Sequence, residues 1–326
     1  MKIVFLFISI FSGTLLFAQQ PFGGGTGESK DNAYQMWTKE HLIELSDSLD
    51  SDNYKPWSDL WHKDKHFSLM QNIDNITRYL GSFNAHFYGN GKTITVIGDM
   101  ATPLFVGIDS TIENLILNGY SERAIGIVGS VAYRWNEYAT ALISRGRVFY
   151  CINNATIINP TEYNGASGIA SYNYGTITHC LNNGNVSGVD MVAGILAQNL
   201  SVVSNCINTG KITGSEFIDN GYSGVGGIVA RHQYINISNC INLGVVEGIN
   251  YIGGVAGSSF SGRGGSPTII ANCINSGYIK GNKLVGGIVG KNDYFTVNVL
   301  PATLTNCVNT GVVEGEEDVG AIVGKE

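Results

Sequence analysis

Apolar residues in this chain occur in short pieces that recur in a fixed order. The first piece has the form Ile-x-x-Cys-Ile-Asn, as at residues 237–242. The second is a short apolar stretch after a Gly, as at 211–213, and the third has the form Val-Gly-Gly-Ile-Val, as at 225–229. Such pieces, separated by Gly and Asn, are typical of short strands with sharp corners. No part of the repeats keeps a helical periodicity over two turns, which excludes repeats built from helices.

The cysteines mark the repeat, because all six occupy the same position in the first piece. Leu115 fills that position in an earlier copy, and the copies follow one another at intervals of 26 to 36 residues. A unit repeated at such intervals stacks on copies of itself. The pattern therefore predicts an all-β chain folded as a single-stranded parallel β-helix, a solenoid with three short strands per rung. The six cysteines are Cys151, Cys180, Cys206, Cys240, Cys273 and Cys307.

Stacking places these cysteines in one column. We expect buried, reduced thiols that act as small hydrophobic side chains, and Leu115 in the same position supports this interpretation. Side chains of an in-register column point the same way, which is a poor geometry for a disulfide. Disulfides between neighbouring rungs stay open as the alternative, because rungs about 4.8 Å apart lie within the Cα range of a disulfide.

An Asn stands two residues after every Cys. Stacked Asn side chains form hydrogen-bonded ladders and satisfy the backbone of turns, so we expect a structural ladder. A row of ligand-binding amides is the alternative. The six residues are Asn153, Asn182, Asn208, Asn242, Asn275 and Asn309.

The chain begins with a predicted signal peptide at residues 1–18. Lys2 precedes an apolar run over residues 3–17, and Ala18 offers a cleavage position. The run is shorter than the roughly 20 residues of a membrane-spanning helix, although an N-terminal anchor is the alternative. We therefore expect an exported protein without a membrane span in its mature chain.

Residues 19–80 are expected to form a leader and an N-terminal cap, ahead of a β-helix over residues 81–326. The stretch 19–33 is polar and rich in Gly, which predicts a flexible leader. A helix is predicted at about 38–49, with Thr38 as its N-cap. Its apolar face, formed by Leu42, Leu45 and Leu49, would cover the open end of the stack.

Charge narrows the classes of partner and activity. Only 14% of the residues are charged, against about 25% in ordinary soluble domains, and the net charge is −7 without any Lys/Arg cluster. Binding to nucleic acid is therefore not expected. Acidic residues in the repeats are few, and no pair recurs beside a Lys or Arg, so we expect no enzymatic activity. The six His do not form a metal-binding motif such as His-Glu-x-x-His, and we expect no metal and no cofactor. The acidic run at 314–318 is interpreted as a charged edge that prevents end-to-end stacking, with weak cation binding as the alternative.

Insertions interrupt the repeat at fixed corners and carry aromatic residues, often beside Arg. Aromatic and Arg side chains are common in recognition patches, so these are the candidate ligand contacts. The alternative is that the insertions fold back and bury their aromatic rings. The candidates are Tyr133, Arg134, Trp135, Tyr138, Phe260, Arg263, Tyr294 and Phe295.

Several phrases resemble the GLUG-repeat proteins of bacterial surfaces. They are Phe87-Tyr-Gly-Asn-Gly-Lys-Thr-Ile94, the stretch 111–117, and Val-Gly-Gly-Ile-Val-Gly alternating with Asn-Cys-Ile-Asn-Thr-Gly. Tyr34-Gln-Met-Trp-Thr38 resembles the leader of such proteins, so the resemblance covers about residues 30–326. It implies a right-handed β-helix on exported proteins, sometimes attached to an IgA-cleaving metallopeptidase or to adhesin-like chains. The metallopeptidase signature is absent from this sequence, so that activity is not carried over.

Together these observations predict a non-enzymatic, exported scaffold with an adhesin-like or surface-binding role. Its expected partner is a host or bacterial surface glycan or protein, and its expected location is extracellular, at the cell surface, or in association with the outer membrane or periplasm. Two alternatives stay open. One is a carbohydrate-active β-helix enzyme, and the other is a spacer or fragment of a larger surface protein.

Overall fold

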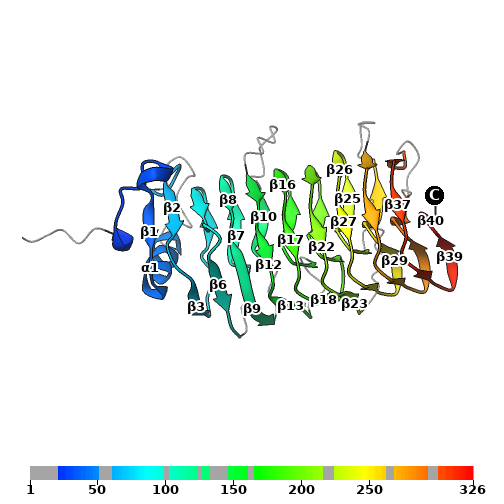
Figure 1. Ribbon diagram of the computed structural model, residues 1–326, viewed down its shortest axis with the longest axis horizontal. Helices are drawn as coiled ribbons and strands as arrows, with labels where there is room; N and C mark the ends of the chain where they lie inside the picture. The colour runs from blue at the N-terminus through cyan, green and yellow to red at the C-terminus, as the bar shows by residue number, and fades with distance from the viewer. Residues whose placement is uncertain are drawn as a thin grey trace, which may run out of the picture.

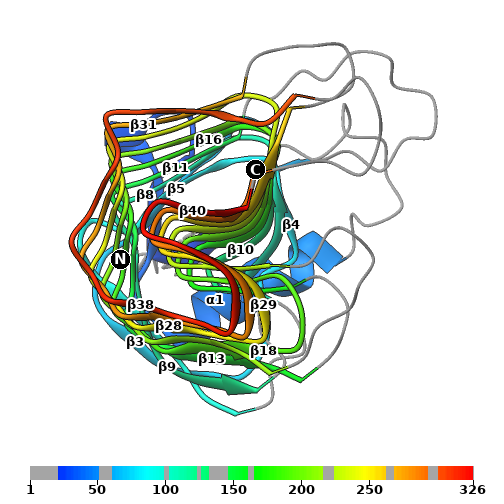
Figure 2. The same ribbon diagram turned by 90° about the vertical axis from the view of Figure 1, so that its right-hand side faces the viewer.

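The chain forms a rod of stacked parallel rungs, seen from the side in Figure 1 and along its axis in Figure 2. This computed structural model describes residues 21–50, 61–98, 103–122, 126–131, 146–160, 165–215, 224–261, 268–292 and 300–325. The predicted signal peptide lies outside them. Every strand pair among these residues is parallel, and each strand pairs with its counterpart in the neighbouring rung. The predicted parallel β-helix is thus confirmed.

One rung contains five short strands, so the expected count of three is wrong. In the rung from Thr176 to Asn199, the first apolar piece is split at His179, whose backbone is left-handed with a φ of 54°. The third piece is split at Gly194, where a Cβ atom would lie 2.4 Å from Asn208 Oδ1. The five strands are β16 (Thr176–Thr178), β17 (Leu181–Asn182), β18 (Val186–Gly188), β19 (Val192–Ala193) and β20 (Leu196–Asn199).

The strands of successive rungs assemble into four sheets, named A to D in the order in which a rung visits them. Besides β16, sheet A contains β1 (Tyr34–Met36), β2 (His66–Leu69), β5 (His86–Tyr88), β8 (Thr111–Glu113), β11 (Arg147–Phe149), β21 (Val202–Ser204), β26 (Asn236–Ser238), β31 (Ile269–Ala271) and β36 (Thr303–Thr305). Besides β19, sheet C contains β14 (Ala166–Ser167), β24 (Val225–Gly226), β29 (Asn250–Gly253), β34 (Lys283–Gly286) and β39 (Glu317–Gly320).

Sheet B receives two strands from most rungs, which the long strand β9 joins in one. Besides β17 and β18, it contains β3 (Ile73–Ile76), β6 (Thr93–Val96), β9 (Ile116–Glu122), β12 (Ile152–Asn153), β13 (Thr156–Asn159), β22 (Ile207–Asn208), β23 (Ile212–Gly214), β27 (Ile241–Asn242), β28 (Val246–Glu247), β32 (Ile274–Asn275), β33 (Ile279–Lys280), β37 (Val308–Asn309) and β38 (Val313–Glu314). Besides β20, sheet D contains β4 (Ser82–Phe83), β7 (Phe105–Ile108), β10 (Val128–Val131), β15 (Ala170–Asn173), β25 (Val229–Gln233), β30 (Ala256–Phe260), β35 (Val289–Lys291) and β40 (Val323–Lys325).

Register keeps like residues above one another. Ile177 pairs with Val148 on one side and with Val203 on the other, and all three are fully buried. Their strand neighbours Thr176 and Thr178 alternate to the outer face of sheet A and are partly exposed. The core is therefore a continuous apolar column inside the coil.

The N-terminal end of the rod carries helix α1 (Lys39–Asp50), as Figure 1 shows. Leu42, Leu45 and Leu49 are each at most 2% exposed, and Thr38 Oγ1 accepts a hydrogen bond from the His41 backbone at 3.4 Å. The predicted helix and its apolar face are confirmed. Strand β1 pairs with β2, and β2 with β5, so the coil already includes residues that were expected to precede it.

The predicted flexibility of the leader is wrong for residues 21–33. This stretch forms the short 3-10 helices η1 (Pro21–Gly23) and η2 (Lys30–Asn32). Phe22 is only 4% exposed, and its ring lies 5.3 Å from Tyr34 and 5.7 Å from Phe67. The glycines permit tight turns here, since Gly25 has a φ of 80° and a Cβ atom would lie 2.0 Å from Ala33 O.

Candidate functional site

The six asparagines form a ladder inside the coil. Asn182 Nδ2 donates to Asn208 Oδ1 at 2.7 Å, and the same bond joins the other neighbours at 2.7–2.8 Å. Each Nδ2 also donates to the carbonyl two residues later, as Asn182 does to Gly184 O at 2.8 Å. The first five are fully buried, so these amides hold the corner together and do not face a ligand.

The cysteine column lies beside this ladder and carries free thiols. Burial raises the pKa of the Cys180, Cys206 and Cys240 thiols well above the usual value, and the hydrogen bond to Cys240 raises the pKa of Cys273 to about 12. These thiols therefore stay protonated at neutral pH, whereas a metal ligand or a nucleophile must be a thiolate. Among the described residues, no group of three or more His, Cys, Asp or Glu side chains is placed to hold a metal ion.

Phe260, one of the predicted ligand contacts, is buried and not exposed. It is 2% exposed in strand β30, and the Arg231 guanidinium lies 5.3 Å from the centre of its ring. For this residue the expectation of an exposed ligand contact is wrong. The alternative interpretation, in which the aromatic ring is buried against the coil, is correct for Phe260. The other candidates lie outside the described residues; they are Tyr133, Arg134, Trp135, Tyr138, Arg263, Tyr294 and Phe295.

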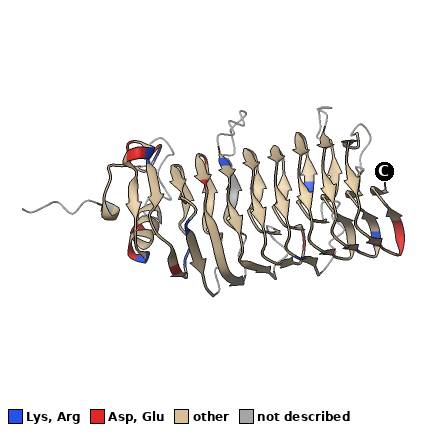
Figure 3. Cartoon of the chain, viewed as in Figure 1, with Lys and Arg blue, Asp and Glu red and all other residues tan. Residues whose placement is uncertain are grey.

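Charged side chains are sparse over the described strands, as Figure 3 shows. The Lys283 ammonium in β34 lies 2.6 Å from Glu317 on the last rung, and within that rung Lys325 lies 3.7 Å from Asp318. All but Asp318 of these four side chains are more than a third exposed, so each pair adds little to stability. No helix among the described residues has the length and apolar character needed to cross a membrane.

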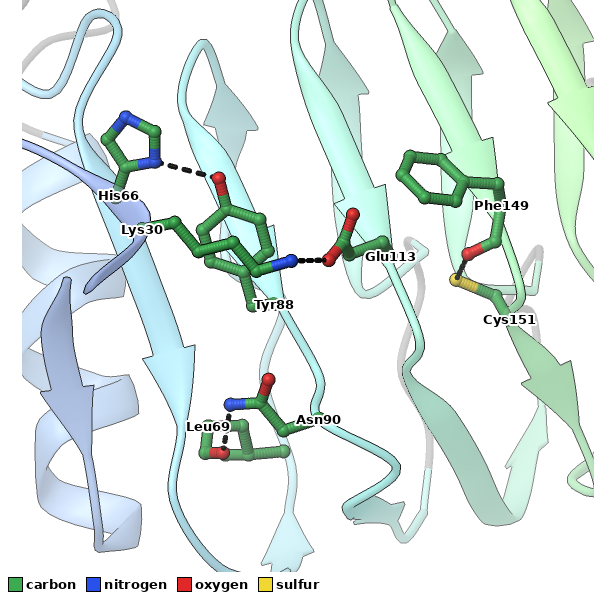
Figure 4. A network of polar contacts seen from close by, with 8 residues as sticks. All are labelled: Lys30, His66, Leu69, Tyr88, Asn90, Glu113, Phe149 and Cys151. Atoms are coloured by element: carbon green, nitrogen blue, oxygen red, sulfur yellow. Dashed lines mark hydrogen bonds and ion pairs between the residues drawn. The ribbon is translucent and has the colours of Figure 1, made fainter.

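A polar network ties the leader to the outer face of sheet A (Figure 4). Tyr88 Oη lies 2.7 Å from His66 Nδ1. Lys30 forms an ion pair with Glu113, and the Lys30 ammonium also lies 4.5 Å from the centre of the Tyr88 ring. Burial raises the pKa of Tyr88 to about 12 and lowers that of His66. A protonated phenol can donate a hydrogen bond to a neutral imidazole, which fixes the Tyr88 ring on sheet A. Lys30 of the leader then contacts both this ring and Glu113, and so attaches the leader to the coil. Sequence patterns could not reveal this network, because its members are far apart in the chain.

A regular and largely exposed feature is the corner between sheets A and B. One residue per rung, directly before the cysteine position, turns the chain with a left-handed φ of 51–54°. We call these residues the corner column. They are Asn114, Tyr150, His179, Asn205, Asn239, Asn272 and Asn306.

Three of the six neighbouring pairs in the corner column are in side-chain contact from rung to rung. Asn272 Nδ2 donates to Asn239 Oδ1 at 3.2 Å, and Asn306 Nδ2 to Asn272 Oδ1 at 3.3 Å. The Tyr150 and His179 rings lie 4.9 Å apart. All members are exposed except Asn205, which is partly buried. The sequence does hold a signal for this column, since Asn precedes Cys in four of the six phrases.

Small polar groups continue from the corner across sheet A. Thr178 Oγ1 lies 3.0 Å from Ser204 Oγ in the next rung, and Asn205 Nδ2 donates to the same Thr178 hydroxyl at 3.5 Å. The corner column and the Thr178–Ser204 part of sheet A thus form one outer face of amides and hydroxyls with an aromatic pair. We take this face as the candidate functional site.

Comparison with known proteins agrees with this architecture. Residues 281–314 match the family described as the GLUG motif. The fold is similar to that of a putative immunoglobulin A1 protease from Bacteroides ovatus, with a TM-score of 0.59, 17% identity, and coverage of 87% of this chain and 86% of that chain. At this identity the likeness concerns the fold alone. No curated protein matches the chain. Residues 281–314 and the repeats of the same form make this chain a GLUG-motif repeat protein that folds as a parallel β-helix.

Proposed function

We propose that this chain is an exported, non-enzymatic scaffold with an adhesin-like role, which binds a surface glycan through the corner column and the adjoining face of sheet A. The observation that carries the proposal is the column itself, in which each rung presents one side chain at the same backbone angle. Equivalent side chains stand about 4.8 Å apart along the rod. Such a row is suited to a ligand that is itself a chain of repeated units.

The chemistry of the face favours a glycan over a charged polymer. Asn amides, as at Asn239 and Asn272, offer both donors and acceptors, and the hydroxyls of Thr178 and Ser204 do the same. Sugar hydroxyls need both. The chain is acidic overall with a net charge of −7, which disfavours polyanions. Export is proposed from the signal peptide at residues 1–18, and the GLUG motif is consistent with it.

A binding screen tests the proposed function. Residues 19–326 are applied to arrays of neutral and acidic glycans and of extracellular matrix proteins. We expect retention on neutral glycans that changes little when the salt concentration rises, because uncharged groups make the contacts. The double variant Asn239→Gly/Asn272→Gly removes two amides while Gly keeps the left-handed backbone, so weaker retention is expected from a folded protein.

Two results would contradict this proposal. Retention on proteins alone would assign the face to a protein partner. Release of shortened glycans during incubation would favour the carbohydrate-active enzyme. As the matched control, Leu243→Ala changes an exposed side chain outside the corner column and should leave retention unchanged.

A further inference from the structure

Two adjacent members of the corner column are aromatic, where the others are Asn. Tyr150 and His179 both have a φ of 54°. A left-handed backbone costs most residues about 1 kcal/mol, and Asn tolerates it better because its short side chain bonds locally. Asn occupies this corner on both sides of the pair, at Asn114 and Asn205. The fold thus accepts Asn here. His is also enriched at such backbone angles, but Tyr is not, so the Tyr150 ring is not what the backbone prefers.

Packing does not account for the two rings either. Tyr150 is 55% exposed and His179 is also exposed, so neither ring fills the core. The residues that follow them in the chain, Cys151 and Cys180, are at most 1% exposed, so the core beneath the pair is filled by the cysteine column. A strained backbone at Tyr150 that adds nothing to the packing of the core points to a role outside the molecule.

The geometry of the pair is that of an ordered aromatic platform. The ring centres lie 4.9 Å apart with 34° between the planes, and Phe149 packs edge-on against Tyr150 at 5.7 Å. The Thr178 hydroxyl lies 2.9 Å from His179 Nδ1, which orients the imidazole. Rings held in place by neighbours lose little conformational entropy when a ligand binds.

We infer that Tyr150 and His179 form a stacking subsite for a neutral pyranose ring, with Asn114 and Asn205 receiving hydroxyls of the flanking sugar units. The inference rests on the proposed function and names its central contact. One face of a pyranose presents C–H groups, which carry slight positive charge and match the negative face of an aromatic ring. The edge of the pyranose ring presents hydroxyls that both donate and accept hydrogen bonds. The side-chain amides of Asn114 and Asn205 also do both, and can therefore pair with them. The ligand chain would run along the rod axis.

Substitution by the residue that the corner prefers tests this subsite. Tyr150→Asn and His179→Asn restore the pattern of the column, so both variants should fold and melt at or slightly above the temperature of the wild type. Binding is measured by calorimetry with cellohexaose, mannohexaose and chitohexaose as probes, on the chain 19–326. For a probe that the wild type binds, we expect about a tenfold loss of affinity in Tyr150→Asn. Tyr150→Phe keeps the ring and should retain affinity within about twofold.

The outcomes separate this inference from the proposed function. If the wild type binds a hexasaccharide and Tyr150→Asn binds it equally well, the subsite is wrong while glycan binding stands. If the wild type binds no glycan on the arrays or in the calorimeter, the proposed function fails, and the subsite with it. Saturation-transfer NMR adds a direct readout, since the sugar C–H protons that face the rings should receive clearly less magnetisation from the Tyr150→Asn/His179→Asn variant than from the wild type.

Discussion

At the scale of single residues, each letter of the recurring phrase Asn-Cys-Ile-Asn has its own structural reason. In the copy at 239–242, Asn239 turns the chain with a left-handed backbone, and Cys240 points into the core, fully buried. Ile241 is half-buried on the outside, and Asn242 returns to the inside to join the ladder. Cys suits the inner position because it is small and apolar when protonated, and burial keeps its pKa high.

Cys240 is therefore a sensitive site for stability. Cys240→Asp should lower the free energy of unfolding by about 3–5 kcal/mol, because it buries a charge without a partner. Cys240→Ser should cost about 1–3 kcal/mol through a poorly satisfied hydroxyl. Urea denaturation followed by circular dichroism measures both. Leu243→Asp, at a position 52% exposed, is the control and should change little. An unchanged midpoint for Cys240→Asp would contradict the buried column.

At the scale of elements, the sequence indicated which apolar pieces form strands. It did not indicate that the first and third pieces of a rung are each split into two strands. The apolar pieces and the Leu face of α1 follow from periodicity alone. The break before each Cys depends on the backbone angle at residues such as His179, which apolar patterning does not report. Gly-rich composition suggested a flexible leader, yet the packing of Phe22 against distant rings orders it. Phe260 likewise depends on contact with Arg231, from the rung before.

A second, shorter amide ladder lies at the C-terminal ends of strands in sheet D. Asn173 Nδ2 donates to Asn199 Oδ1 at 2.9 Å, and Asn199 Nδ2 lies 3.1 Å from His232 Nδ1. In register, His232 is followed by Ser259. Both are fully buried, and among the described residues neither His232 Nε2 nor Ser259 Oγ has a hydrogen-bond partner. His232 is thus an imperfect member of the ladder.

Burial lowers the pKa of His232 to about 3, which makes stability depend on pH. The unfolded state takes up a proton near the usual pKa of about 6.5, while the folded state resists it, so acid favours unfolding. We expect His232 to lower the free energy of unfolding progressively as the pH falls from about 6.5 towards 3, by an amount on the order of 5 kcal/mol in full. His232→Asn should remove this dependence and extend the ladder.

Urea midpoints of wild type and His232→Asn at pH 7 and pH 4.5 measure the effect. The difference between the two proteins should be larger at pH 4.5, because the wild type alone carries the cost of a buried imidazole. His179→Asn, which changes an exposed histidine, serves as the control. An equal loss of stability in wild type and His232→Asn between the two pH values would exclude His232 as the source.

At the scale of the whole molecule, the rod is held together by contacts between neighbouring rungs. Backbone bonds of this kind run through every sheet, as from Leu181 N to Cys151 O at 2.9 Å and from Ile207 N to Cys180 O at 2.9 Å. The Asn ladder and the stacked core residues add side-chain contacts between the same neighbouring rungs. Stability of such a solenoid is approximately a sum over rungs and their interfaces. A complete rung should therefore be dispensable, provided that the register of the remaining rungs is kept.

The rung between Cys180 and Cys206 allows this to be tested, because its repeat is only 26 residues long and all of it is described. Deleting residues 181–206 joins Cys180 to Ile207 and recreates the phrase Cys-Ile-Asn-Thr-Gly. We expect a folded rod that unfolds cooperatively and is shorter by about 4.8 Å. Circular dichroism and small-angle X-ray scattering measure both properties.

The matched control deletes residues 182–206, one residue fewer. This variant shifts every following strand by one position relative to the rung before it, which turns core side chains outward at the junction. We expect it to aggregate or to lose the cooperative transition, although it retains more of the chain. Equal behaviour of the two deletions would mean that the register of the columns does not determine the fold. Failure of the in-register deletion alone would show that this rung makes contacts beyond its two neighbours.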